Sequence, residues 1–120
     1  MVIFLDTYAM IEIAKGNPDY QKFADSASIT TRFNLAELYF YFLKTTDEAT
    51  ADSIYSRFKD YEIFAADRII KEAMKLKLAN AKKRLSFADC IGYTAAMLEE
   101  STFLTGDYQF KDMENVEFVR

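Results

Sequence analysis

The segment from Phe33 to Leu43 constrains the fold more than any other part of the chain. Nine of its eleven residues are apolar or aromatic, and a single carboxylate, Glu37, lies in the middle. A helix that is apolar on nearly every side is normally buried. An ionised carboxylate in such a place is costly unless it is paired with a cation or bound to a metal. The alternative is that Glu37 lies on a narrow solvent-facing stripe beside Lys44.

The composition is typical of a single globular domain over residues 1–120. Hydrophobic residues make up 51% of the chain, with three glycines and one proline, which argues against a disordered or repetitive chain. No apolar run approaches the roughly 20 residues that span a bilayer, and the first residues resemble a strand rather than a signal peptide. The single cysteine, Cys90, suits a reducing compartment. We therefore expect a cytoplasmic protein with no membrane contact.

The residue types that are missing narrow the possible chemistry. The chain has no histidine, which rules out a Ser-His-Asp triad and histidine-ligated zinc. It also has no glycine-rich phosphate-binding loop. The net charge of −4 argues against a broadly basic nucleic-acid surface but leaves room for a local one.

Strand-like and helical segments alternate along the whole chain. We expect strands at residues 2–5, 29–31, 61–64, 102–105 and 116–119. We expect helices at residues 7–14, 18–24, 33–44, from a Thr45–Glu48 capping box onward, at 66–83 and at 86–100. This alternation indicates an α/β fold, namely a three-layer α/β/α sandwich with a mainly parallel central sheet.

Four acids lie where such a fold can bring them to one edge of the sheet. Asp6 and Asp107 follow expected strands, Asp89 lies in the first turn of a helix, and Glu37 lies in the apolar helix. Functional groups gather at the carboxyl ends of parallel strands. Carboxylates packed together raise one another's pKa unless a cation lies among them, and oxygen-only ligation selects Mg²⁺ or Mn²⁺. Such an ion can activate water for phosphodiester hydrolysis.

Three of these acids also have a purely structural interpretation. Asp6 can cap the helix that follows it, and Asp89 fits a capping pattern with Ser86. Asp107 can be an ordinary turn residue after Gly106.

The segments around the four acids resemble the four motifs of PIN domains, especially those of small single-domain VapC-type toxins. The segments are Phe4–Thr7, Leu35–Leu38, Leu85–Cys90 and Leu104–Phe110. The resemblance extends from Ile3 to Val119. It implies a metal-dependent ribonuclease on an α/β/α sandwich, often a homodimer, with an antitoxin partner in the toxin branch.

This resemblance assigns roles to individual residues. It implies that Asp6, Glu37, Asp89 and Asp107 are the catalytic acids and the ligands of Mg²⁺ or Mn²⁺. It places hydroxyls near the metal at Thr7 and Thr105, where they orient water or carboxylates. The implied reaction is RNA hydrolysis by a water molecule that Asp6 or Asp89 orients or deprotonates, leaving a 5′-phosphate and a 3′-hydroxyl.

One position departs from the family pattern. Many relatives carry a further acid where this chain has Gln109, which argues against a second bound metal.

Basic and aromatic residues are candidates for contact with the RNA. The helix expected at 66–83 has a basic stripe, which is either a substrate rim or a solvated face. Lys77 lies on the apolar side of this helix. Its side chain must therefore extend past the apolar surface to bring the ammonium group to solvent, or the helix must bend. Tyr8 and Tyr93 either stack on bases or pack within the protein. The stripe and its extension comprise Arg68, Lys71, Lys75, Lys82, Lys83 and Arg84.

Other classes of protein fit the sequence less well. Asp6 with Asp107 and Asp112 has a weak similarity to haloacid-dehalogenase-type phosphatases, but Tyr8 stands where their second aspartate belongs. Receiver domains require an acidic pair after the first strand, where this chain has Asp6 alone. A non-catalytic PIN-like interaction module remains an alternative. Its partner groove would use the aromatic residues Tyr39, Tyr41, Phe42, Tyr55 and Phe58.

Overall fold

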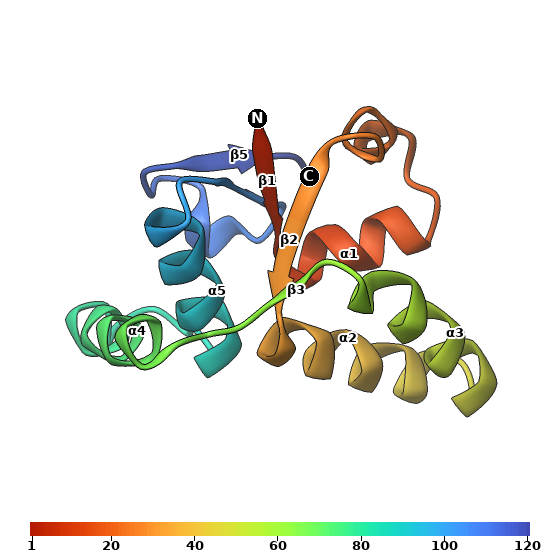
Figure 1. Cartoon of the computed structure of the whole chain (residues 1–120), viewed down its shortest axis with the longest axis horizontal. Helices are drawn as coiled ribbons and strands as arrows, with labels where there is room; N and C mark the ends of the chain where they lie inside the picture. Colours follow the sequence, from red (N-terminus) through yellow and green to blue (C-terminus); the bar gives the residue numbers. More distant parts are fainter.

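Five strands form the central sheet of the computed structural model, which describes residues 1–120 (Figure 1). They are β1 (Val2–Leu5), β2 (Ala27–Thr31), β3 (Glu62–Ile63), β4 (Thr102–Thr105) and β5 (Val116–Phe118). Their order in the sheet is β3-β2-β1-β4-β5, and every neighbouring pair is parallel. All five carboxyl ends therefore point to the same edge of the sheet.

The strands alternate with helices, as the sequence predicts. The helices are α1 (Thr7–Ala14), η1 (Pro18–Phe23), α2 (Arg32–Thr45), α3 (Glu48–Lys59), α4 (Asp67–Ala79), α5 (Phe87–Leu98) and η2 (Tyr108–Phe110). None of them is long and apolar enough to cross a bilayer.

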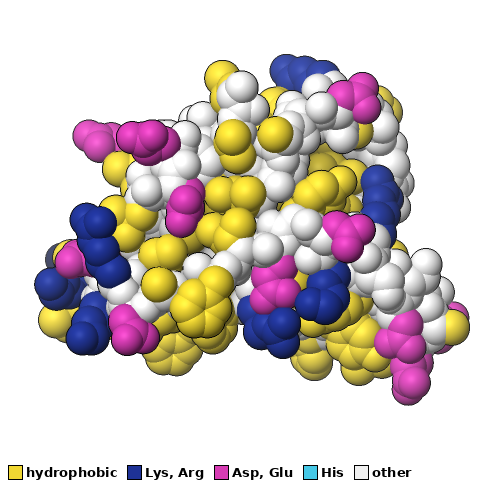
Figure 2. All heavy atoms as spheres, viewed as in Figure 1, with side chains coloured by type: hydrophobic (Ala, Val, Ile, Leu, Met, Phe, Trp, Pro, Cys, Tyr) yellow, Lys and Arg dark blue, Asp and Glu magenta, His cyan; other side chains and the backbone are white.

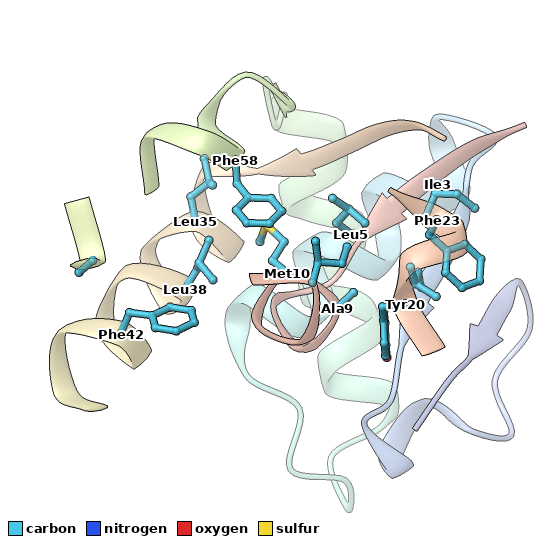
Figure 3. Packing of buried hydrophobic residues seen from close by; sticks show 13 residues of the cluster. Ile3, Leu5, Ala9, Met10, Tyr20, Phe23, Leu35, Leu38, Phe42 and Phe58 are labelled. Atoms are coloured by element: carbon cyan, nitrogen blue, oxygen red, sulfur yellow. The ribbon is translucent and has the colours of Figure 1, made fainter. Parts of the chain in front are cut away.

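Two hydrophobic cores lie on opposite faces of the sheet. In β1, Ile3 and Leu5 point into one core and Phe4 into the other, because successive side chains of a strand alternate between its faces. The first core is completed by α1, η1, α2 and α3, and Figure 3 shows Leu5 and Met10 lying near Phe58 of α3. The second core is completed by α4 and α5. This arrangement confirms the predicted three-layer α/β/α sandwich.

The expectation that the 33–44 helix is buried on nearly every side is wrong. Phe33, Phe40 and Leu43 are 41%, 65% and 43% exposed, and Glu37 is half-buried. In Figure 1, α2 runs along the bottom of the view, past the carboxyl end of β2, with no further layer beneath it. Its inner side alone is buried, through Leu35, Leu38 and Phe42.

Two helix boundaries differ from those predicted. The helix expected to reach Lys83 ends at Ala79, where Asn80 leaves the helical conformation and both its backbone N–H and its side-chain amide donate to the Leu76 carbonyl, at 3.0 and 2.9 Å. Lys82 therefore does not belong to the basic side of α4. The expected Thr45–Glu48 capping box is also wrong: Asp47 caps α3 by accepting from the Thr50 N–H at 2.8 Å.

Removing the Phe58 side chain should cost much of the domain's stability. Phe58 is 1% exposed, so Phe58→Ala should leave a cavity and lower the free energy of unfolding by about 3–5 kcal/mol. Phe40→Ala is the matched control, since Phe40 is 65% exposed and its loss should change stability by about 0.5 kcal/mol or less. Urea unfolding of both variants measures the difference. Equal losses would contradict the layer assignment.

Candidate active site

The pairing of β1 with β4 joins two of the predicted acids through one hydroxyl group. Leu5 is in register with Leu104, and the Asp6 N–H donates to the Leu104 carbonyl at 3.2 Å. The Thr105 hydroxyl donates to Oδ2 of Asp6 at 2.7 Å and accepts from the N–H of Asp107 at 3.0 Å. The ends of the two strands are thereby held together at the carboxyl edge of the sheet.

Asp6 is buried and does not act as a helix cap. Its side chain is at the N-cap position of α1 but makes no capping hydrogen bond, so the structural interpretation of this residue fails. Asp6 is only 2% exposed. Burial first, and then the negative charges of Asp89 and Glu37, raise its pKa to about 8, although the hydrogen bond from Thr105 opposes this.

Glu37 is connected to Asp6 through a buried amide that the sequence reasoning missed. The Thr7 hydroxyl donates to Oε1 of Glu37 at 3.1 Å. The Asn34 amide donates to the Thr7 hydroxyl at 3.2 Å and lies 3.5 Å from Oδ1 of Asp6. Its own oxygen accepts from the Thr31 hydroxyl at 2.6 Å. One signal was available: Asn34 lies one helical turn before Glu37 on the same face of an apolar segment.

Asp89 caps the first turn of α5 and also lies close enough to the other acids to interact with them electrostatically. Ser86 and Asp89 form a reciprocal capping box, so that interpretation is correct. Burial first, and among the charges those of Glu37 and Asp107, raise the Asp89 pKa to about 6 against the hydrogen bonds from Ser86. Since Asp89 also raises the Asp6 pKa, Asp89 is linked electrostatically to each of the other three carboxylates.

A glycine allows α5 to lie close to this network. A Cβ atom on Gly92 would lie 2.9 Å from Oδ1 of Asn34 and 3.0 Å from the Phe4 ring. Because Gly92 follows Asp89 by about one helical turn, this close contact also brings the first turn of α5 toward Asn34.

The predicted hydroxyl residues orient carboxylates, as the family resemblance implies: Thr105 binds Asp6 and Thr7 binds Glu37. The remaining oxygens Oε2 of Glu37, Oδ1 of Asp89 and Oδ2 of Asp107 accept no hydrogen bond from the protein. In the present side-chain positions, no three carboxylates form a group that could hold a metal ion. The donor set itself is all oxygen and fits a hard divalent cation. Metal binding by these residues therefore remains a prediction.

Gln109 uses its side-chain amide away from the four acids. Its oxygen accepts from the Arg84 N–H at 2.5 Å, and its nitrogen donates to the Arg84 carbonyl at 3.1 Å. The Lys83 ammonium group donates to the Gln109 carbonyl at 2.6 Å. The loop between α4 and α5 is thus tied to η2.

Two residues of the basic stripe of α4 lie beside the end of α5 that is far from Asp89. Arg68 and Lys75 line a cavity beside Met97 and Leu98 at the end of α5, whereas Asp89 is in its first turn. Basic side chains gather around α4 at the left of Figure 2. Lys77 is half-buried, and its ammonium group donates to the Leu85 carbonyl rather than extending freely into solvent as predicted.

Tyr93 is a core residue rather than a platform for bases. It is 7% exposed, stacks on Phe110 with ring centroids 5.9 Å apart, and donates its hydroxyl to the Glu114 carbonyl. Tyr8 is half-buried and lies against Gly106.

The fold and the site together define a structural class: α/β/α sandwich domains with an all-parallel sheet and four acids at the carboxyl ends of its strands. The model of the PIN domain family matches residues 3–116, so this chain belongs to the PIN domain family.

Solved structures share this fold at low sequence identity. VapC20 of Mycobacterium tuberculosis, a sarcin-ricin loop cleaving toxin, gives a TM-score of 0.77 at 12% identity over 95% of this chain and 98% of that chain. VapBC2 of Rickettsia felis, bound to a promoter DNA fragment, gives 0.75 at 18% identity over 99% and 98%. FitAcB of Neisseria gonorrhoeae gives 0.71 at 16% identity over 98% and 96%. A comparison with curated proteins gives no match.

The raised pKa values predict how the stability of the metal-free protein depends on pH. Between its unfolded pKa near 4 and its folded pKa of about 8, Asp6 keeps a proton in the native state that the unfolded state has lost. Stability should therefore fall as pH rises from about 4 to 8. Asp6→Asn should flatten this fall and melt above wild type at pH 8.

Thermal melts in EDTA test this, and Asp112→Asn is the control at an exposed acid. Mn²⁺ should raise the wild-type Tm at pH 8 more than at pH 5, because ligand carboxylates must be deprotonated. A wild-type melting curve with no dependence on pH would contradict the assignment of Asp6.

Proposed function

We propose that this protein is an endoribonuclease that depends on Mg²⁺ or Mn²⁺ and is the toxin of a toxin–antitoxin pair. The observation that carries the proposal is the group of four electrostatically linked carboxylates at the carboxyl edge of a PIN-domain sheet. The fold it shares with a toxin that cleaves the sarcin-ricin loop supports RNA as the substrate. A further similarity to a toxin–antitoxin complex from Klebsiella pneumoniae supports the toxin role.

The metal would be held by Asp6, Glu37, Asp89 and Asp107, directly or through water. When bound, such an ion polarises the scissile phosphate and lowers the pKa of the attacking water. One ion is proposed, because Gln109 supplies no carboxylate and its amide is bound to the backbone of Arg84.

The chain's own residues orient the acids and accept a proton. Thr105 and Thr7 fix the directions of Asp6 and Glu37, so these carboxylates need little reordering when they bind. In the metal-free protein the pKa of Asp89 is raised to about 6, so this carboxylate is mostly ionised at neutral pH and available to hold the metal or to accept a proton from the attacking water. Attack by water on phosphorus would break the bond to the 3′-oxygen, which leaves with a proton from solvent as a 3′-hydroxyl, while the phosphate stays on the 5′-oxygen, as the family resemblance implies.

RNA cleavage with Mn²⁺ tests this function directly. Wild type should cut RNA with Mn²⁺ and not with EDTA, and Asp6→Asn and Asp89→Asn should each lower the rate by about 100-fold or more. Asp112→Asn changes an exposed acid outside the group and should cut like wild type. Unchanged cleavage by both Asp6→Asn and Asp89→Asn would assign the activity to another site or to a contaminant.

An antitoxin partner and a homodimer are part of the same proposal. The aromatic groove suggested by the sequence does not exist as such, because Phe42 and Phe58 are buried and the rings of Tyr39 and Tyr55 pack edge to face between α2 and α3. The apolar side chains that remain exposed on α2 suit a protein partner, and apolar surface gathers along the lower edge of Figure 2. Because of these exposed side chains, a non-catalytic module that binds a protein partner is the second candidate function. Membership of the PIN family excludes the phosphatase and receiver alternatives.

The homodimer predicts a defined mass in solution. Light scattering should give about twice the chain mass of 13.9 kDa at micromolar concentration. The single-chain mass across the whole concentration range would contradict the dimer without affecting the proposed activity.

We also propose that the protein is located in the cytoplasm, in agreement with the free, buried Cys90.

A further inference from the structure

Two cations are held on aromatic rings next to the acidic edge. The guanidinium carbon of Arg120 lies 4.1 Å from the centroid of the Tyr108 ring. The Lys111 Nζ lies 5.7 Å from the centroids of both Tyr108 and Phe118. These two rings contact each other, with centroids 5.5 Å apart. We refer to Tyr108, Lys111, Phe118 and Arg120 as the basic aromatic cluster.

The cluster borders the chain segments that carry two of the four acids. Arg120 Nη1 donates to the carbonyl of Gly106 at 2.9 Å, and Gly106 and Tyr108 are the two neighbours of Asp107 in the chain. The Arg120 guanidinium also lies 5.8 Å from the ring of Tyr8, which follows Asp6 by two residues.

Neither cation of the cluster is neutralised by an Asp or Glu side chain. The ion pairs of the structure involve Lys15, Arg32, Lys59 and Lys75, so no Asp or Glu carboxylate lies within 4.0 Å of Lys111 or Arg120. Both residues are exposed. A cation–π contact uses one face of a cation and leaves its remaining N–H groups free to bind an anion.

Because the chain is acidic overall, cations without a carboxylate partner near the site indicate where a polyanion can bind. With a net charge of −4 and four acids in the site, the protein repels a polyanion unless cations lie close to the place where it binds. Arg68 and Lys75 of α4 lie beside the end of α5 that is far from Asp89, whereas Arg120 binds the carbonyl of Gly106 next to Asp107.

We propose that Lys111 and Arg120 bind a phosphate of single-stranded RNA next to the phosphate that is cleaved, and that Tyr108 and Phe118 position the two cations. The proposal rests on the RNA-cleaving function proposed above. Tyr108 is 59% exposed, so its ring can also contact an unstacked base, which favours a single strand over a duplex.

RNA binding measured as a function of salt tests the cluster. Fluorescence anisotropy with a short labelled single-stranded RNA is recorded on Asp89→Asn protein, which should not cut it, between about 50 and 200 mM KCl. In that protein, Lys111→Gln and Arg120→Gln should each weaken binding several-fold at low salt. Each should also reduce the slope of log K against log salt by about 0.7, the value for one lost phosphate contact on a single strand.

Two further variants separate charge from structure. Arg120→Lys keeps the charge and should keep most of the salt slope. Lys71→Gln removes an exposed, unpaired cation of α4 and should leave both affinity and slope unchanged. The Lys111 side chain makes no hydrogen bond or ion pair, so Lys111→Gln should fold normally and decides the question even if Arg120→Gln unfolds.

Unchanged affinity and salt slope in folded Lys111→Gln would overturn the cluster as a phosphate site. If wild type cuts RNA normally in that case, the proposed function stands and only this site fails. If the Asp89→Asn protein does not bind RNA, the phosphate site is overturned, and the proposed function is overturned with it only if wild type also fails to cut RNA with Mn²⁺.

Discussion

The register between β1 and β4 is the constraint on which the site depends. These strands are separated by almost the whole chain, yet their pairing places Thr105 where its hydroxyl reaches both Asp6 and the backbone of Asp107. A slip of one residue would turn the side chains of β4 to the opposite face and remove Phe103 and Leu104 from their cores. The packing that stabilises the sheet therefore also fixes the positions of two acids.

The ionised form of the buried Asp6 side chain is unfavourable, and the stability of the surrounding fold offsets this free-energy cost. Asp6 is desolvated among like charges, and its raised pKa shows that the ionised form costs free energy when no cation is bound. The buried amide of Asn34 and the Thr31 cap tie α2 to the end of β1 beside this residue. Such destabilising groups persist where function requires them and where the rest of the structure supplies enough stability.

Much of the fold could be predicted because local pattern and tertiary packing agree. The strand at 102–105 and the helix at 7–14 have the predicted bounds, since each combines an apolar pattern with a clear end signal. The failures have identifiable causes. At Asn80 the side-chain amide and the backbone N–H both bind the Leu76 carbonyl and end α4, and at Asp47 a nearer cap replaces the predicted one. In α2, the sequence shows how apolar the helix is but not that only one of its sides meets another layer.

The sequence by itself determined the class of fold and the four candidate acids, because these depend on periodicity and on residue types at element ends, and the resemblance of four short motifs indicated the family. Tertiary structure alone decided which of the acids are tied to hydroxyls, that Asn34 lies among them, and that Tyr93 belongs to the core. It also decided that Lys111 and Arg120, rather than the cations of α4, lie beside Asp107. The physical reason is that these relations join residues far apart in the chain, and their distances are set by strand register and helix packing.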